Sequence, residues 1–191
     1  MAFLHRRAFL RVSGAAALSA ASSFAIPALA KVAAPAVVGT KPTDCRTLVM
    51  DCLRSGETLK SDYWVDGKYV PDELVRINKL LRDVRSNDIY PIDVKLIDLL
   101  HSLNDSVGGK SFEIICGYRS PATNEMLRKH SSGVASRSLH MKGQAIDLRV
   151  KGRALTQVHE AALNLNLGGV GYYPKSDFVH VDTGRVRRWA G

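Results

Sequence analysis

Short apolar stretches of strand-forming residues, set between helix-like stretches, constrain the fold of this chain most strongly. Four such stretches lie in its second half, at residues 112–117, 144–150, 170–173 and 178–182. Strand-forming residues dominate them, and turn-forming residues separate the last two. Helices followed by interleaved short strands are typical of the α+β class, so we expect an antiparallel sheet.

The first half predicts a small sheet and two helices. Strand-like stretches at residues 47–53, 58–65 and 68–70 predict a β-meander. A helix is expected from Pro71, because apolar residues recur after it at spacings of three and four: Leu74, Ile77, Leu80, Leu81 and Val84. A second helix is expected over residues 92–103.

Two more helices are expected in the second half. Ser120 is placed to cap a short helix that begins at Pro121. Another is expected over residues 155–165, ending near the Gly168-Gly169 pair.

Residues 1–30 have the order of an export signal. A basic region with Arg6, Arg7 and Arg11 precedes an apolar run at residues 12–26, and Ala28-Leu29-Ala30 provides a small-residue cleavage site. The arginine pair resembles the twin-arginine (Tat) signal, which exports folded proteins. If this signal is cleaved, the remaining chain has no stable membrane insertion, and if the signal is retained, it anchors the chain to the membrane. Either outcome predicts that the rest of the chain lies in the periplasm.

The rest of the chain has the composition of a linker followed by one globular domain. Residues 31–44 are rich in Ala, Val and Pro and are expected to be the linker. The whole chain is 46% hydrophobic with a net charge of +9, and its apolar runs are short, which excludes disorder and multi-span membrane topology. Nucleic acid is not an expected partner of an exported chain that lacks interleaved basic and aromatic residues.

Three cysteines allow at most one disulfide. The pairing of Cys45 with Cys52 stays open. Cys116 follows Ile114 and Ile115, so we expect it to be a buried strand residue.

Two histidines lie in settings that suit a metal site. His140 precedes the strand that contains Asp147, and His180 lies in the middle of another strand. Two neutral imidazoles and one carboxylate make a three-ligand zinc site with a position left for water. A histidine packed in the core is the alternative for each residue alone. Gly143 favours the metal site, because it permits a close backbone approach beside His140.

The same residues carry a family resemblance. Ser138-x-His140-x-x-Gly143-x-Ala145-x-Asp147, followed by Asp177-x-x-His180, resembles the zinc-site pattern of the D-alanyl-D-alanine metallopeptidase family. Residues 46–189 resemble its periplasmic YcbK-type branch, the murein endopeptidases. The resemblance implies that residues 45–191 form a zinc peptidase domain. It also implies the hedgehog-like fold, an antiparallel sheet with helices packed on one side.

The resemblance also implies roles for single residues. His140, Asp147 and His180 would hold Zn²⁺, and Asp177 would be the general base. Arg119 would polarise the scissile carbonyl or clamp a substrate carboxylate, and Ser138 would bind substrate. Asp182 is a second candidate for the base, because it shares a strand face with His180.

The function implied is hydrolysis of amide bonds in the stem peptides or cross-bridges of peptidoglycan. Two alternatives stay open: a D-alanyl-D-alanine carboxypeptidase or dipeptidase, and a non-catalytic peptidoglycan-binding module with structural zinc. The bond type, D,D or L,D, and the oligomeric state stay open as well. Six basic residues are candidates for attraction to the anionic cell wall: Lys142, Arg149, Lys151, Arg185, Arg187 and Arg188.

Overall fold

The structure is a computed structural model that describes residues 44–109, 111–131 and 133–191. The expected export signal at residues 1–30, and all of the expected linker except Asp44, lie outside the described residues. Over the described part of the chain, none of the helices combines the length and the apolar character that a membrane span requires.

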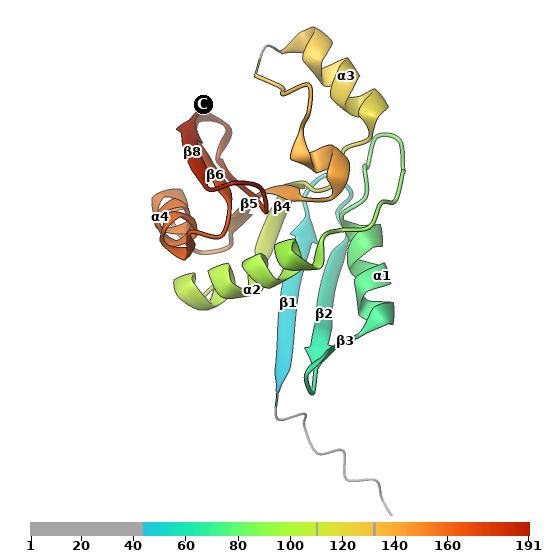
Figure 1. Ribbon diagram of the computed structural model, residues 1–191, viewed down its shortest axis with the longest axis vertical. Coiled ribbons are helices and arrows are strands. Elements are labelled where there is room, and N and C mark those ends of the chain that lie inside the picture. Colours follow the sequence, from blue (N-terminus) through green and yellow to red (C-terminus); the bar gives the residue numbers. More distant parts are fainter. Residues whose placement is uncertain (1–43, 110, 132) are drawn as a thin grey trace, which may run out of the picture. The chain divides into compact units, whose positions relative to one another are not determined.

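The described residues form one eight-stranded sheet in the order β3-β2-β1-β4-β5-β7-β6-β8 (Figure 1). The strands are β1 (Cys45–Cys52), β2 (Thr58–Val65), β3 (Lys68–Tyr69), β4 (Phe112–Cys116), β5 (Ala145–Val150), β6 (Gly169–Tyr173), β7 (Phe178–Asp182) and β8 (Arg187–Ala190). The expected β-meander is confirmed, and so are the four strands expected in the second half. β8 was not expected from the sequence.

The sheet is mixed, so the expectation of an antiparallel sheet is only partly right. β1 pairs with β4 in parallel, and β6 pairs with β8 in parallel, while the other neighbours are antiparallel. Two helices separate β1–β3 from β4, which gives the chain the length that a parallel return requires. The chain reverses again after β7, and β8 therefore runs parallel to β6.

The described residues contain four α-helices: α1 (Pro71–Leu80), α2 (Val94–Val107), α3 (Pro121–His130) and α4 (Leu155–Leu165). α4 has the expected bounds, and the cap of α3 is confirmed because the Ser120 hydroxyl accepts a hydrogen bond from Thr123 N at 3.2 Å. α1 ends earlier than expected, and Val84 lies beyond it. The carbonyl of Leu81 accepts from Tyr118 N at 2.7 Å, which ties the end of α1 to the segment after β4.

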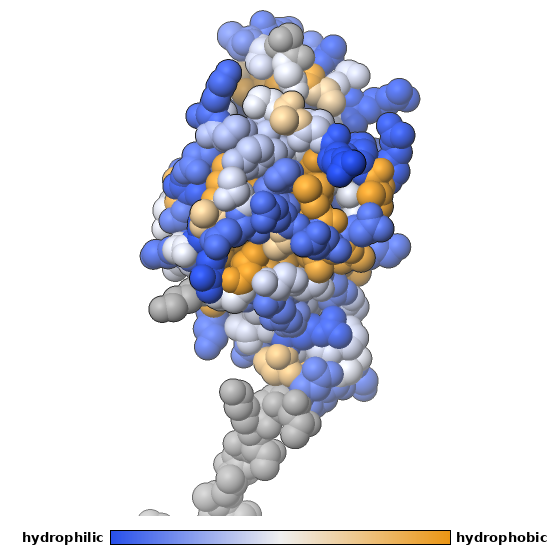
Figure 2. Space-filling model, turned by 90° about the vertical axis from the view of Figure 1, so that its left-hand side faces the viewer, coloured by the Kyte–Doolittle hydropathy of each residue, from blue (hydrophilic) through white to orange (hydrophobic). Residues whose placement is uncertain are grey.

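Three helices cover one face of the sheet. Residues of α1, α2 and α4 share a single hydrophobic core with the inward side chains of the strands. α2 and α4 also pack against each other, and α3 stands apart from this core (Figure 1). The expectation that the helices pack on one side of the sheet is therefore right for three of the four described helices. The face that carries α4 and β8 is mainly hydrophilic, with hydrophobic patches between hydrophilic side chains (Figure 2).

Strand alternation directs a second set of side chains away from this core. Val179 and Val181 of β7 are buried in the core, so His180 between them points to the opposite face. β5 and β7 pair in a register that places Asp147 opposite His180. The polar residues expected to bind metal therefore meet on the face that α1, α2 and α4 leave uncovered.

Candidate metal centre

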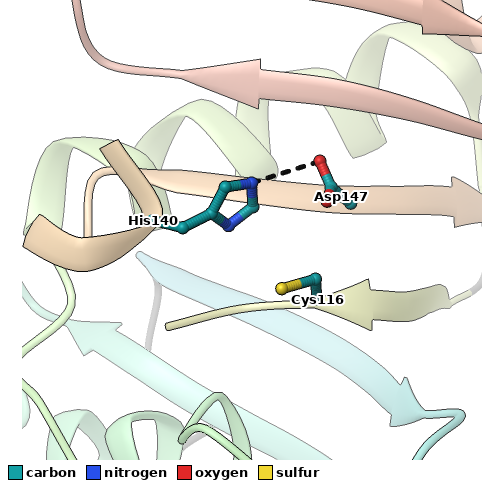
Figure 3. Close-up of side chains that lie close together, drawn as sticks. All are labelled: Cys116, His140 and Asp147. Atoms are coloured by element: carbon teal, nitrogen blue, oxygen red, sulfur yellow. Dashed lines mark ion pairs between the residues drawn. The ribbon is translucent and has the colours of Figure 1, made fainter. Parts of the chain in front are cut away.

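The three expected ligands come together in the structure. His140 lies on the 3₁₀ turn η1 (Leu139–Lys142), Asp147 on β5 and His180 on β7. Oδ1 of Asp147 lies 2.8 Å from Nδ1 of His180 and 3.3 Å from Nε2 of His140. The two ring nitrogens are 3.3 Å apart. Figure 3 shows His140 reaching from its turn toward Asp147 on the strand.

Hydrogen bonds at the far side of each ring assign the tautomers. Nδ1 of His140 lies 2.7 Å from the carbonyl oxygen of Gly117, which can only accept, so this nitrogen carries the proton. Nε2 of His180 lies 3.0 Å from the Asp182 carboxylate and is the donor for the same reason. The remaining nitrogens, Nε2 of His140 and Nδ1 of His180, therefore direct lone pairs at Oδ1 of Asp147. With both rings neutral, three lone pairs meet at these distances, and either a proton or a metal ion between them relieves their repulsion.

Charge at the centre supports the same conclusion. Burial alone would lower the pKa of His140, but the negative charges of Asp147 and Cys116 raise it to about 10. Burial alone would raise the pKa of Asp147, but His140 lowers it well below its usual range. Without a metal, the cluster therefore holds a proton on His140 beside the Asp147 carboxylate, and a metal ion bound at the same point would take the place of that proton.

Cys116 belongs to the same cluster, which the sequence did not indicate. Ligand atoms of Cys116, His140 and Asp147 all lie within 4.8 Å of one another (Figure 3). A register shift between Ile114 and Cys116 in β4 places Cys116 opposite Asp147. Simple alternation would have put it on the core side with Ile114. The sulfur of Cys116 accepts a hydrogen bond from Arg119 Nη2 at 3.6 Å, whereas Nε2 of His140 and Nδ1 of His180 face Asp147.

Asp182 supports His180 from behind. Its buried carboxylate accepts from Gly169 N at 3.2 Å and from Gly184 N at 2.9 Å. Arg187 binds both of its oxygens, at 2.9 and 2.7 Å. Both oxygens are therefore engaged, and one of them fixes the orientation of the His180 ring.

Arg119 and Ser138 lie beside the cluster. Nη2 of Arg119 is 3.8 Å from Oδ2 of Asp147, and its Nε is buried without a hydrogen-bond partner among the described residues. Ser138 is buried at the start of η1. Both side chains line the cleft described below.

The structure does not bring Asp177 to the three ligands. It follows the 3₁₀ turn η2 (Pro174–Ser176) with a left-handed backbone, φ 53°. Its carboxylate forms an ion pair with Arg149, which also binds Glu113 at 2.6 Å. Arg149 lies two residues after Asp147, on the same face of β5.

A cleft of about 490 Å³ opens over the cluster. Its polar floor includes the three expected ligands, and aromatic side chains from three elements line it: Tyr173, Phe178 and Trp189. Trp189 comes from the unexpected strand β8 and donates a hydrogen bond to the Tyr173 hydroxyl at 2.8 Å. The sequence did not predict this strand, because two arginines precede Trp189 and charged residues are weak strand signals.

Comparison with known proteins identifies the family of this chain. Residues 40–189 match the sequence profile of the peptidase family described as Peptidoglycan L,D-endopeptidase MepK. The proteins of that name from Escherichia coli strain K12 and from Shigella flexneri are each 41% identical to this chain over 186 residues, which is 97% of this chain and 97% of the relative. Expected membership in the murein endopeptidase branch is thereby confirmed. The chain belongs to the M15 metallopeptidase family, in the branch described as Peptidoglycan L,D-endopeptidase MepK.

Proposed function

We propose that this protein is a zinc-dependent endopeptidase that cleaves L,D-peptide bonds in peptidoglycan cross-bridges. The convergence of lone pairs from His140, Asp147 and His180 at the floor of the cleft carries this proposal. The bond type follows the name of the relatives, which are peptidoglycan L,D-endopeptidases.

The donor set fits zinc. Two neutral imidazole nitrogens and one carboxylate oxygen are a common catalytic zinc set, and they leave room for a further ligand. We therefore assign the metal to His140, Asp147 and His180. Bound zinc supplies a Lewis acid for the peptide carbonyl and lowers the pKa of a coordinated water toward about 7.

Arg119 and Ser138 are assigned to the substrate. The guanidinium of Arg119 lies at the edge of the cluster and is placed to stabilise negative charge that develops on the scissile carbonyl oxygen. Ser138 lines the same cleft and is assigned to substrate binding.

Asp177 is assigned as the general base. In that role it takes a proton from the attacking water and returns it to the leaving amine. Its side chain is 60% exposed, so it has room to leave Arg149 and turn toward the cleft when substrate is bound. Asp182 fits this role poorly, because both of its oxygens already accept hydrogen bonds.

The site of action follows from the substrate. Peptidoglycan lies outside the cytoplasmic membrane, and residues 1–30 are proposed to export the chain to the periplasm by the twin-arginine route. The excess of positive charge on the chain supports attraction to the anionic cell wall.

Digestion of purified sacculi that contain both L,D and D,D cross-links tests the proposal. The zinc-loaded protein should convert L,D-linked muropeptide dimers to monomers and leave D,D-linked dimers intact, as identified by chromatography and mass spectrometry. His180→Ala should lose both metal and activity. Release of a terminal amino acid alone would indicate a carboxypeptidase, and binding to sacculi without any product would indicate a binding module.

A further inference from the structure

A second hollow adjoins the cleft at the candidate metal centre. Its volume is about 210 Å³, and it shares Arg119, Asp147 and Phe178 with the cleft. The two hollows therefore meet at the position where the scissile bond is proposed to lie. A peptide that occupies the cleft on one side of that bond has the second hollow available on the other side.

The second hollow combines apolar walls with cationic groups. Leu80, Leu81 and Leu127 are among its apolar residues. Arg54 and Arg85 also line it, and both residues are exposed. Such a hollow suits a short aliphatic side chain that ends in a negatively charged group.

The positive charge of this hollow is only partly neutralised by the protein. Arg82 is paired with Glu57 at 2.6 Å. Asp83 is buried and accepts from the backbone amides of Arg85 and Ser120, at 3.0 and 2.9 Å. Among the described residues, no acidic side chain forms an ion pair with Arg54 or Arg85.

A hydrogen bond from Nε fixes Arg54 and leaves the terminal nitrogens of its guanidinium available to bind an anion. Its Nε donates to the carbonyl oxygen of Ile115 at 3.0 Å, next to the β4 residue Cys116. This bond anchors the guanidinium at the end of β4, and within the part of the chain that the structure describes, its two terminal nitrogens form no ion pair. A guanidinium fixed in this way binds a carboxylate with two parallel hydrogen bonds.

We propose that the second hollow is a subsite for a free carboxylate on the peptide substrate, beside the scissile bond, with Arg54 as its main ligand and Arg85 as a second. The chemical class that it selects is an aliphatic amino acid residue with an unmodified carboxylate. This inference rests on the proposed function, because it names the part of the substrate that lies on the second side of the bond.

Two cross-linked peptides test the subsite. They are identical except that the carboxylate beside the scissile bond is free in one and amidated in the other. The wild-type protein should cleave the free form at least tenfold better, mainly through a lower KM. Arg54→Gln should remove this preference by weakening cleavage of the free form alone, and Arg54→Lys should restore only part of it.

Matched variants separate a subsite from a general effect of charge. Arg76→Gln removes an exposed arginine of α1 that pairs with Glu73 and should leave both rates unchanged. Arg85→Gln should lower the preference less than Arg54→Gln. Equal loss on the free and amidated peptides, or no change in either, would overturn the subsite.

Binding measurements keep this test independent of the reaction. Calorimetry with the metal-free protein should show tighter binding of the free peptide than of the amidated peptide, and Arg54→Gln should abolish the difference. Metal-dependent cleavage of both peptides at equal rates would overturn the subsite and leave the endopeptidase assignment standing. Selective binding of the free peptide without cleavage of either would support the subsite and contradict the proposed function.

Discussion

Asp182 holds His180 through a contact of 3.0 Å between its Oδ2 and Nε2 of the ring. Burial alone would raise the pKa of Asp182, but hydrogen bonds from His180 and Arg187 lower it well below its usual range. A carboxylate in this state is a poor proton acceptor. It keeps the proton on Nε2 of His180 and so directs Nδ1 to the proposed metal position.

Asp182→Asn is expected to weaken metal binding by about 10- to 100-fold, because the amide supports the ring less well than the carboxylate. Metal affinity measured by competition with a chelator checks this, and added zinc should restore much of the activity. Asp105→Asn, at an exposed position of α2, is the control and should bind metal normally. An Asp182→Asn protein with normal metal affinity and no activity would instead assign the base role to Asp182.

Asp177→Asn is expected to keep the metal and to lower kcat by about 10² or more, the usual contribution of a general base. Metal analysis and initial rates on cross-linked muropeptides check both parts. Asp177→Glu retains a carboxylate and should retain much more activity than the amide variant. Full activity of Asp177→Asn would contradict the assignment.

Local patterns predicted most of the elements in this fold. β7 and α4 have the bounds that apolar alternation and helical spacing indicate. Local spacing carries no information on which strand pairs with which, so the parallel β1–β4 and β6–β8 pairs were not predicted. β8 itself is four residues long, and its Trp189 packs over Gly171 only in the tertiary structure.

The sequence predicted three residues that lie together at the candidate site, but it did not predict their surroundings. Residue types and the family resemblance pointed to His140, Asp147 and His180, and the β5–β7 register brings the last two together. Cys116 was missed because the register shift in β4 reverses its side, which no residue type signals. The pairing of Asp177 with Arg149 depends on strand neighbours, and a sequence pattern alone does not reveal it.

Gly143→Ala is expected to destabilise the fold by about 3 kcal/mol. Gly143 has a φ of +63°, and an added Cβ would lie 2.3 Å from the carbonyl oxygen of Pro91. The close backbone approach expected from the sequence is thereby confirmed. Because Gly143 ends the turn that carries His140, metal affinity should fall as well. Urea unfolding and chelator competition measure the two effects.

Gly152→Ala is the matched control for Gly143→Ala. Gly152 also has a positive φ, +76°, but an added Cβ there meets no described residue within 4 Å. Backbone strain alone should therefore cost about 1 kcal/mol, with metal affinity unchanged. Equal losses of stability in the two variants would show that the contact with Pro91 does not matter.

Asp83 is expected to make stability depend on pH between about pH 4 and pH 2. Burial alone would raise its pKa, but hydrogen bonds from Thr123, Ser120 and Arg85 lower it from 3.8 to about 2. Because the folded state holds the ionised form more strongly than the unfolded state does, Asp83 stabilises the fold above about pH 4. That contribution, on the order of 2 kcal/mol, is lost as the pH falls through the folded pKa.

Asp83→Asn should therefore be less stable than wild type by about 1–3 kcal/mol at pH 6. The difference between the two proteins should shrink toward pH 2. Urea unfolding of both metal-free proteins across this range provides the measurement, with Asp105→Asn as the exposed control. A difference that stays constant from pH 6 to pH 2 would show that ionisation of Asp83 does not stabilise the loop that carries Arg119.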